Sequence, residues 1–294
     1  MAFFSNLRLH RPDQGIYKFL AKACVKFLMD LNAKRESPLN LGPVIKFILA
    51  EKAFIKYAFM CFLYNQKAES RFRAWLKLFK KKGIFLEVEA YNFLFGFSLS
   101  FVNFLDQTFP GLKDSITVLN GINALAITNL GCSKIKTLDG NVLEWRYFKT
   151  EEKSGAVFNP VSSAWVPIKI YHLTNSLDPK KLELSFLPNL IHSVDAFIVR
   201  RLCLEVFKSC NYILQHTHDS FSFHPNLMKA VNEAISGSYE GSGSWLKAIL
   251  IDPLKQDLEE RGNQEGLMLL ESFSKELKTL KPEAFEVKYQ YPLE

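Results

Sequence analysis

The residues whose types could do chemistry are concentrated in the stretch YILQHTHDSFSFHP, residues 212–225. Apolar and polar residues alternate through it as they do in a strand, which predicts a hairpin with His218, Asp219 and Ser220 at its turn. An acid and a histidine would then lie at the tip of two apolar strands. Such a tip holds its side chains rigidly, as a catalytic or metal site requires.

Three interpretations of this hairpin are compatible with its residues. His216 and His218 lie on one face of the strand and could share a metal, although the acid of a metallohydrolase signature is normally spaced from them. Histidines beside a turn are otherwise commonly surface groups with a structural role. In the third interpretation the hairpin belongs to a polymerase palm, where Asp219 binds catalytic magnesium through its oxygens. That interpretation requires matching features elsewhere.

The composition predicts a soluble, globular protein with one or two cores. Of the 294 residues, 48% are hydrophobic and the mean hydropathy is −0.01. The five cysteines include no C-x-x-C spacing, so they indicate neither a disulfide framework nor a zinc site. The apolar run from Tyr91 to Leu105 has 15 residues, short of the roughly 20 that span a bilayer, and predicts a buried helix. The start, MAFFSNLRLHRP, does not resemble a secretory signal.

The positive charge is concentrated in the first part of the chain. Residues 1–82 contain 17 Lys and Arg against 5 Asp and Glu, a net charge of +12, while the other residues carry 20 against 25, a net charge of −5. Such an asymmetry suits a polyanion bound to one part of the molecule, because contacts with phosphates release counterions. Solvated helix faces are the alternative explanation.

Hydrophobic periodicity predicts an α+β, mostly helical fold. Turn residues at Asp139-Gly140 predict a hairpin over 133–149, and residues 164–173 read as extended. The predicted helices cover about 14–34, 44–63, 69–82, 87–106, 113–130 and 192–210, with a helical tail that reaches about 280.

Residues 188–202, PNLIHSVDAFIVRRL, followed by HTHDSF resemble the C-terminal signature of bacteriophage-type single-subunit DNA-dependent RNA polymerases. This family includes mitochondrial and mitochondrial-plasmid enzymes. The segments QGIYKFLAK and KIKTLDGNVLEW resemble the family more loosely. The resemblance implies a right-hand polymerase fold, with fingers over 1–187 and the C-terminal part of the palm, including the catalytic hairpin, over 188–294.

The segment KAFIKYAFMCFLYN resembles the nucleotide-binding helix of the same family. The family has Arg, Lys, Met and Tyr at four-residue steps, and this sequence has Lys52, Lys56, Met60 and Tyr64. At about 1.5 Å per residue, Lys56 and Tyr64 would lie about 12 Å apart, enough to span a nucleoside triphosphate from phosphates to sugar. An ordinary amphipathic helix is the alternative.

The resemblance implies a role for each matching residue. Asp219 would be the one protein ligand present of a two-metal magnesium site. Lys56 would contact the triphosphate, and Tyr64 with His192 would favour ribose over deoxyribose. Lys52 supplies a point charge where the family has a bidentate guanidinium. The implied set is catalytic Asp219 and Lys56; substrate-binding Tyr64, Lys52, His192 and Met60; and supporting His218, Ser220 and Asp195.

The first catalytic motif of the family, an Asp followed by a Gly/Ala-Ser-rich turn, is absent from this sequence. We therefore expect a C-terminal portion of a DNA-directed RNA polymerase that is catalytically silent alone, with another N-terminal polypeptide as one source of the missing motif. The implied partners are a DNA template, an RNA product and nucleoside triphosphates, without a membrane. The resemblance and the many Phe, Lys and Asn residues favour a mitochondrial location.

Two other functions remain open. A family A DNA polymerase shares this palm, but it usually has Glu after the hairpin Asp and Phe near the position of Tyr64, so Ser220 and Tyr64 favour RNA synthesis. A noncatalytic nucleic-acid-binding remnant would use the basic segment alone.

Nucleic-acid binding should depend steeply on salt if the basic segment contacts phosphates. Each contact contributes about −0.9 to the slope of log K against log salt for duplex DNA. Neutralising Lys77, Lys80, Lys81 and Lys82 should weaken binding and make that slope shallower, as measured by fluorescence anisotropy over a salt series. An affinity that ignores salt, or is unchanged in the fourfold variant, would contradict phosphate binding by this segment.

Overall fold

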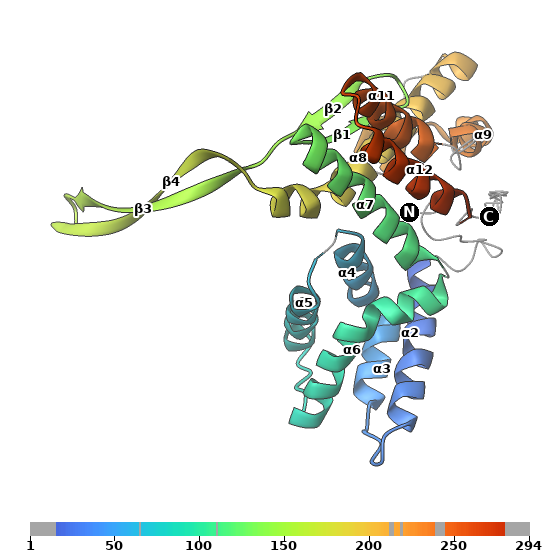
Figure 1. The fold of residues 1–294 in the computed structure, drawn as a ribbon. Helices are drawn as coiled ribbons and strands as arrows, with labels where there is room; N and C mark the ends of the chain where they lie inside the picture. The colour runs from blue at the N-terminus through green and yellow to red at the C-terminus, as the bar shows by residue number, and fades with distance from the viewer. Residues whose placement is uncertain are drawn as a thin grey trace.

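The computed structural model describes residues 16–64, 66–109, 111–211, 215–217, 220–238 and 245–279. These residues form helices and three two-stranded antiparallel sheets, in agreement with the predicted α+β, mostly helical class. Figure 1 shows a lower group of helices, an upper group that contains the C-terminal helices, and a long two-stranded arm that projects from the body. The right-hand polymerase arrangement stays a prediction.

The lower group is built around aromatic side chains. Trp75 is fully buried and stacks on Phe54, with ring centroids 4.5 Å apart, and on Phe97 at 5.6 Å. Burial of such large rings supplies most of the stabilisation that a helical core can gain. The helices of this group are α2 (Ile16–Ala33), α3 (Gly42–Ala50), α4 (Lys52–Leu63), α5 (Ala68–Lys81) and α6 (Val88–Thr108).

The prediction of a single helix over 44–63 is wrong, because the helix is interrupted at Glu51. Its backbone is extended, with φ −104° and ψ 91°, and its N–H donates to the carbonyl of Phe47, which closes α3. The Glu51 carboxylate also pairs with Lys82 at 3.1 Å, at the end of α5. Periodicity along the sequence carries no signal of this break or of its contact with Lys82.

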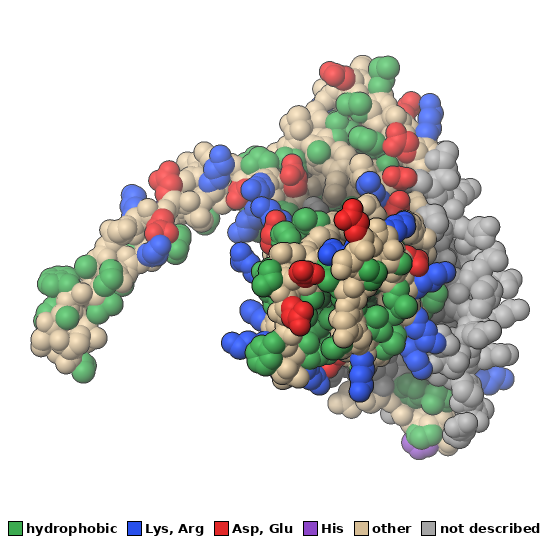
Figure 2. Space-filling model, turned by 90° about the horizontal axis from the view of Figure 1, so that it is seen from below, with side chains coloured by type: hydrophobic (Ala, Val, Ile, Leu, Met, Phe, Trp, Pro, Cys, Tyr) green, Lys and Arg blue, Asp and Glu red, His purple; other side chains and the backbone are tan. Residues whose placement is uncertain are grey.

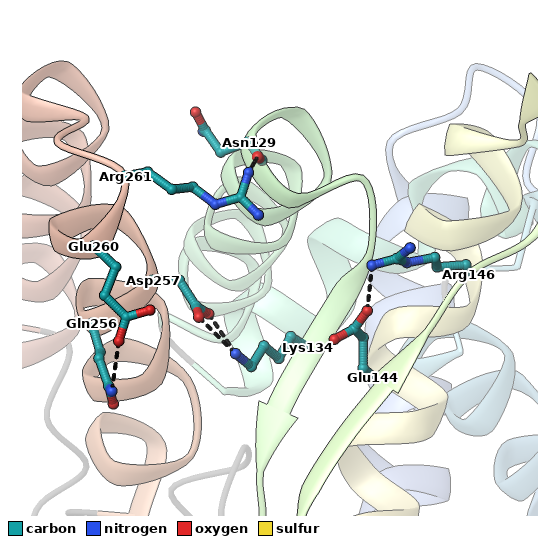
Figure 3. A network of polar contacts seen from close by, with 8 residues as sticks. All are labelled: Asn129, Lys134, Glu144, Arg146, Gln256, Asp257, Glu260 and Arg261. Atoms are coloured by element: carbon teal, nitrogen blue, oxygen red, sulfur yellow. Dashed lines mark hydrogen bonds and ion pairs between the residues drawn. The ribbon is translucent and has the colours of Figure 1, made fainter.

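The upper group packs the C-terminal helices onto α7 (Leu112–Leu130). At Gly121 an added Cβ would lie 2.8 Å from Cζ of Phe273 in α12 (Gln264–Thr279), so a larger residue would force this ring to move. Lys134 pairs with Asp257 through both carboxylate oxygens at 2.7 and 2.8 Å, and Arg261 donates to the carbonyl of Asn129 (Figure 3). The predicted helical tail is divided into α9 (Met228–Ser238), a π-helical turn (Lys247–Ile251), α11 (Asp252–Glu260) and α12 (Gln264–Thr279).

Helix α8 (Pro179–Cys210) connects the hydrophobic cores. Its Ile191 is buried in the core of the lower group, and Leu190 is buried in the core of the upper group. Leu202 and Val206 are buried against α9 in a third, smaller cluster. The helix begins well before the predicted start at 192, because Asp178 caps it by accepting from the N–H of Lys181. The predicted boundary between 187 and 188 therefore falls inside one continuous helix.

Two hairpins precede α8. Strands β1 (Ser133–Lys136) and β2 (Val142–Trp145) pair as predicted, around Gly140 with φ 90°. Strands β3 (Phe148–Asn159) and β4 (Ala164–Leu177) form the arm, of which the sequence predicted only part of β4. Figure 2 shows hydrophobic side chains gathered at the far end of the arm.

Two of the described helices, α6 and α8, are long and apolar enough to cross a membrane by length and composition alone. In α6, however, Leu94, Phe97, Phe101 and Phe104 are buried in the core of the lower group. The predicted buried helix over Tyr91–Leu105 lies within α6.

Trp75→Ala should destabilise the protein by about 3–5 kcal/mol, because it removes a fully buried ring that has stacked neighbours on both sides. Trp165→Ala is the matched control: this side chain is 69% exposed on the arm, and its loss should change the free energy of unfolding by less than about 0.5 kcal/mol. Urea denaturation followed by circular dichroism measures both. Equal losses of unfolding free energy in the two variants would contradict a major contribution of Trp75 to the stability of the core.

Candidate functional site

Helix α4 presents the predicted nucleotide-binding register on one face. Lys52 and Lys56 are exposed, Met60 is half-buried, and Tyr64 follows as the C-cap, half-buried, with its N–H donating to the carbonyl of Met60. The opposite face packs into the core of the lower group through Phe54, Ile55, Ala58, Phe59 and Leu63. Core packing therefore fixes which way the four predicted side chains point.

The two lysines of this register differ in their surroundings. The ammonium of Lys52 lies 5.3 Å from the centre of the Tyr17 ring, a cation–π contact that restrains it toward α2. Lys56 lies one turn later on the exposed face. The arrangement gives α4 one restrained cation and one exposed cation, both of which could face a phosphate chain.

Tyr64 and His192 are in ring contact although they are far apart in the sequence. Their ring centroids are 5.7 Å apart, and the rings are tilted by 41°. Tyr64 comes from the end of α4, and His192 comes from α8. The structure therefore brings together the two residues that were predicted to act together. Their role in sugar selection stays a prediction.

Asp195 lies one turn beyond His192 on α8 and influences Tyr64 through its charge. Burial raises the pKa of Tyr64, and the negative charge of Asp195 raises it further. Both effects disfavour the phenolate, and the protonated Tyr64 hydroxyl can donate a hydrogen bond. The predicted supporting role of Asp195 stays a prediction.

The predicted catalytic hairpin is present as β5 (Gln215–Thr217) and β6 (Ser220–Ser222), paired antiparallel. His218 and Asp219, at its turn, lie outside the described residues, and of Ser220 only the backbone is described. Among the described residues, no three His, Cys, Asp or Glu side chains gather closely enough to hold a metal ion. The predicted magnesium site is therefore not tested by the geometry.

A buried arginine just beyond Tyr64 was not distinguished in the sequence from the other basic residues. Arg71 is 2% exposed, donates through Nη2 to the carbonyl of Ser98 at 2.7 Å, and lies 4.8 Å from the centre of the Phe101 ring. Burial lowers its pKa to about 10. Ser98 Oγ in turn donates to the carbonyl of Ala68. This clamp fixes the start of α5, and Arg71 is one basic residue that cannot bind a polyanion.

The end of α4 is closed by a second set of contacts. Cys61 donates through Sγ to Oε1 of Gln66 at 3.1 Å, and the backbone N–H of Gln66 donates to the carbonyl of Cys61. These bonds hold the turn that carries Tyr64. Cys61 therefore has a local structural role at this turn.

The basic side chains are distributed over both helices that flank α4. Exposed lysines recur at four-residue steps on α2, and Figure 2 shows Lys and Arg side chains on several sides of the lower helical group. Part of this charge is already paired, as in the contact of Lys82 with Glu51. The exposed cations of these two helices are Lys18, Lys22 and Lys26 of α2, and Arg73, Lys77, Lys80 and Lys81 of α5.

Asp195→Asn should lower the pKa of Tyr64, because removing the negative charge makes the phenolate easier to form. The pKa should stay above its ordinary value, since burial is unchanged. Carbon NMR of the tyrosine ring, with Tyr64 assigned through Tyr64→Phe, measures the titration. Glu205→Gln, further along α8, is the control and should leave it unaltered; an unchanged titration in Asp195→Asn would exclude the interaction.

Comparison with known proteins supports the resemblance. Residues 147–265 match the family model described as DNA-dependent RNA polymerase, a stretch that contains His192, Asp195 and both strands of the hairpin. No curated protein matches the chain. Helix α4 lies outside the matched stretch, but its Tyr64 contacts His192 within it. Over residues 147–265, the chain is therefore similar to the phage-type single-subunit DNA-dependent RNA polymerases.

Proposed function

We propose that this chain binds a ribonucleoside triphosphate between α4 and α8 in template-directed RNA synthesis. The reaction is attack of an RNA 3′-hydroxyl on the α-phosphate of the triphosphate, with release of pyrophosphate. The observation that carries the proposal is the contact between Tyr64 and His192. Tyr64 lies at the end of α4, outside the matched residues 147–265, and His192 lies within them. These are the two residues to which the resemblance gives a joint role in sugar selection.

The proposed roles follow the positions of the side chains on α4. Lys56 neutralises the charge of the triphosphate, which grows in the transition state, and Lys52 assists from its place over Tyr17. Tyr64, kept protonated, and His192 hydrogen-bond the ribose 2′-hydroxyl. A site built around such a bond rejects a sugar without the hydroxyl, because its own polar groups are then left unpaired.

DNA-dependent RNA polymerases of this family use Mg²⁺, and Asp219 is the residue that would bind it here. When bound, the metal would activate the attacking hydroxyl and stabilise the leaving pyrophosphate. The described residues supply no cluster of acids for this purpose, so we derive no step through the metal. Because the sequence lacks the Asp-Gly/Ala-Ser motif, we also propose that the 294 residues alone do not extend RNA.

DNA template, RNA product and a mitochondrial location are part of the same proposal. The exposed cations of α2 and α5 suit a nucleic-acid backbone beside α4. A noncatalytic nucleic-acid-binding remnant would also use these cations, but it would have no need to distinguish ribonucleotides from deoxyribonucleotides. Discrimination between the two sugars therefore separates the two functions.

Tyr64→Phe should reduce the preference for ribonucleotides while leaving the contacts with the phosphates in place. Removing the hydroxyl that faces the sugar should lower the ratio of the Kd for dATP to the Kd for ATP by about tenfold, an amount typical of one lost hydrogen bond. Isothermal titration calorimetry on the whole chain measures both constants.

Tyr171→Phe is the matched control, since this tyrosine is 61% exposed on the arm. It should leave the ratio unchanged. An equal ratio in wild type and Tyr64→Phe, or no nucleotide binding at all by the wild-type chain, would overturn the proposed function.

A further inference from the structure

The far end of the β3–β4 arm is an apolar hairpin tip without charge. This arm tip comprises the 15 residues 154–168, which include no Asp, Glu, Lys, Arg or His, whereas Lys153 and Lys169 border it directly. Figure 2 shows hydrophobic side chains gathered there. Val161 in the turn is 94% exposed, and Trp165 on β4 is 69% exposed. Exposed apolar side chains in one continuous patch are typical of a surface that a partner or a membrane covers.

The arm tip is apolar on both faces of its two-stranded ribbon. Phe158 lies opposite Trp165 in the sheet, and their rings are 5.6 Å apart. Val157 lies opposite Val166 at the next position. Because successive side chains of a strand point to opposite faces, the valine pair and the aromatic pair lie on different faces. A flat docking surface would cover only one of them, so this arrangement favours insertion into an apolar medium that surrounds the tip.

The turn at the end of the arm is held by bonds within the hairpin. The side-chain carbonyl of Asn159 accepts from the N–H groups of Val161 at 3.0 Å and of Ser162 at 3.4 Å. The strands below it are paired at every position from Thr150 to Asn159. An element that is already ordered loses little conformational freedom when it inserts.

Charge and backbone chemistry separate the candidate partners of the arm tip. Nucleic acids are bound chiefly through Lys and Arg at their phosphates, and the tip contains neither residue. A second copy of the chain could add a strand to the arm, but Pro167 in β4 has no N–H to donate, and a proline opposes such additions. Two arms stacked face to face would each leave their other face exposed. A lipid bilayer covers both faces and the turn together.

The charges that border the arm tip complement the headgroup layer of a bilayer. Lys153 lies opposite Ile170 and Lys169 opposite Ser154, so the two lysines lie at adjacent positions on different faces of the ribbon. Their ammonium groups can reach lipid phosphates while their methylene groups lie along the arm. Lys169 also pairs with Glu152 at 2.7 Å, which neutralises part of this charge. Burial of apolar surface must therefore supply most of the affinity.

We propose that the arm tip inserts into the interfacial layer of a lipid bilayer, with Phe158, Trp165 and Val161 below the headgroups. Tryptophan favours this layer, because its ring is apolar and its N–H can still reach a polar group. Deeper insertion is disfavoured, since each strand of a two-stranded sheet has one unpaired edge that hydrocarbon would leave without hydrogen bonds. This inference goes beyond the proposed function, and it adds a partner that the resemblance does not imply.

Flotation of the whole chain with phosphatidylcholine vesicles tests insertion directly. This lipid has no net charge, so the lysines of α2 and α5 contribute little to binding. We expect binding that rises with lipid concentration and persists at high sodium chloride, because apolar burial releases no counterions. Failure to bind these vesicles would overturn the proposal.

Lipids brominated in their acyl chains then report which residue enters the bilayer. They should quench the fluorescence of the wild-type chain more than that of Trp165→Phe. Trp75, Trp145 and Trp245 are present in both proteins, so the difference isolates Trp165. Equal quenching in the two proteins would show that the arm tip does not enter the acyl chains, and the proposal would be wrong.

Val161→Asp should lower the partition coefficient for these vesicles by about tenfold or more, because it removes an apolar side chain and its carboxylate must lose hydration. A side chain that is 94% exposed has no core to disturb. Phe85→Asp is the matched control: this residue lies between α5 and α6, is 84% exposed, and should leave partitioning unchanged. Equal partitioning of Val161→Asp and wild type would contradict insertion of the turn.

Two further results would assign the arm tip to another partner and overturn the proposal. One is a chain that does not bind vesicles but binds duplex DNA, with an affinity that Val161→Asp reduces and Phe85→Asp does not. The other is a dimer in sedimentation velocity, formed in place of vesicle binding and lost in Val161→Asp. The sugar preference of nucleotide binding is measured without lipid, so the proposed function and the lipid contact can fail separately.

Discussion

Helix α8 is the element on which the rest of the structure depends, because one helix contributes buried side chains to three separate cores. Ile191 and Leu190 are neighbours in sequence, yet the first belongs to the core of the lower helical group and the second to that of the upper group. A helix in this position must be apolar on more than one side, and α8 has no single apolar stripe. The relative position of the two groups is therefore set by the rigid body of α8.

His192 follows directly after these two core residues. Its side chain is exposed, but its backbone position is fixed by the burial of Leu190 and Ile191. Its backbone cannot move without disturbing both cores, and α4 packs into the lower of these cores through the face opposite Lys52 and Lys56. The contact between the two rings therefore joins two helices that share one core. Sites on anchored helices keep their geometry better than sites on loops, which suits discrimination between sugars that differ by one hydroxyl.

Much of this arrangement could be predicted from the sequence where the signal is local. The register of Lys52, Lys56, Met60 and Tyr64 follows from four-residue spacing, and the β1–β2 turn follows from Asp139-Gly140. Strand β3 was missed because its first half is rich in Lys, Glu and Ser, and pairing with β4 decides its conformation. The burial of Arg71 was missed because a count of charges along the chain contains no information on which side chains turn inward.

The close approach of Phe273 to Gly121 has a consequence for the order in which the molecule is made. Nearly all of the lower core lies between residues 20 and 112, so most of it can form while the chain is still being synthesised. The upper core cannot close completely until α12 has left the ribosome, because part of the apolar surface of α7 stays uncovered until Phe273 reaches Gly121. During that interval the lower core of the nascent chain is folded, while apolar side chains of the upper core are still exposed. These exposed side chains are the part that a chaperone would bind.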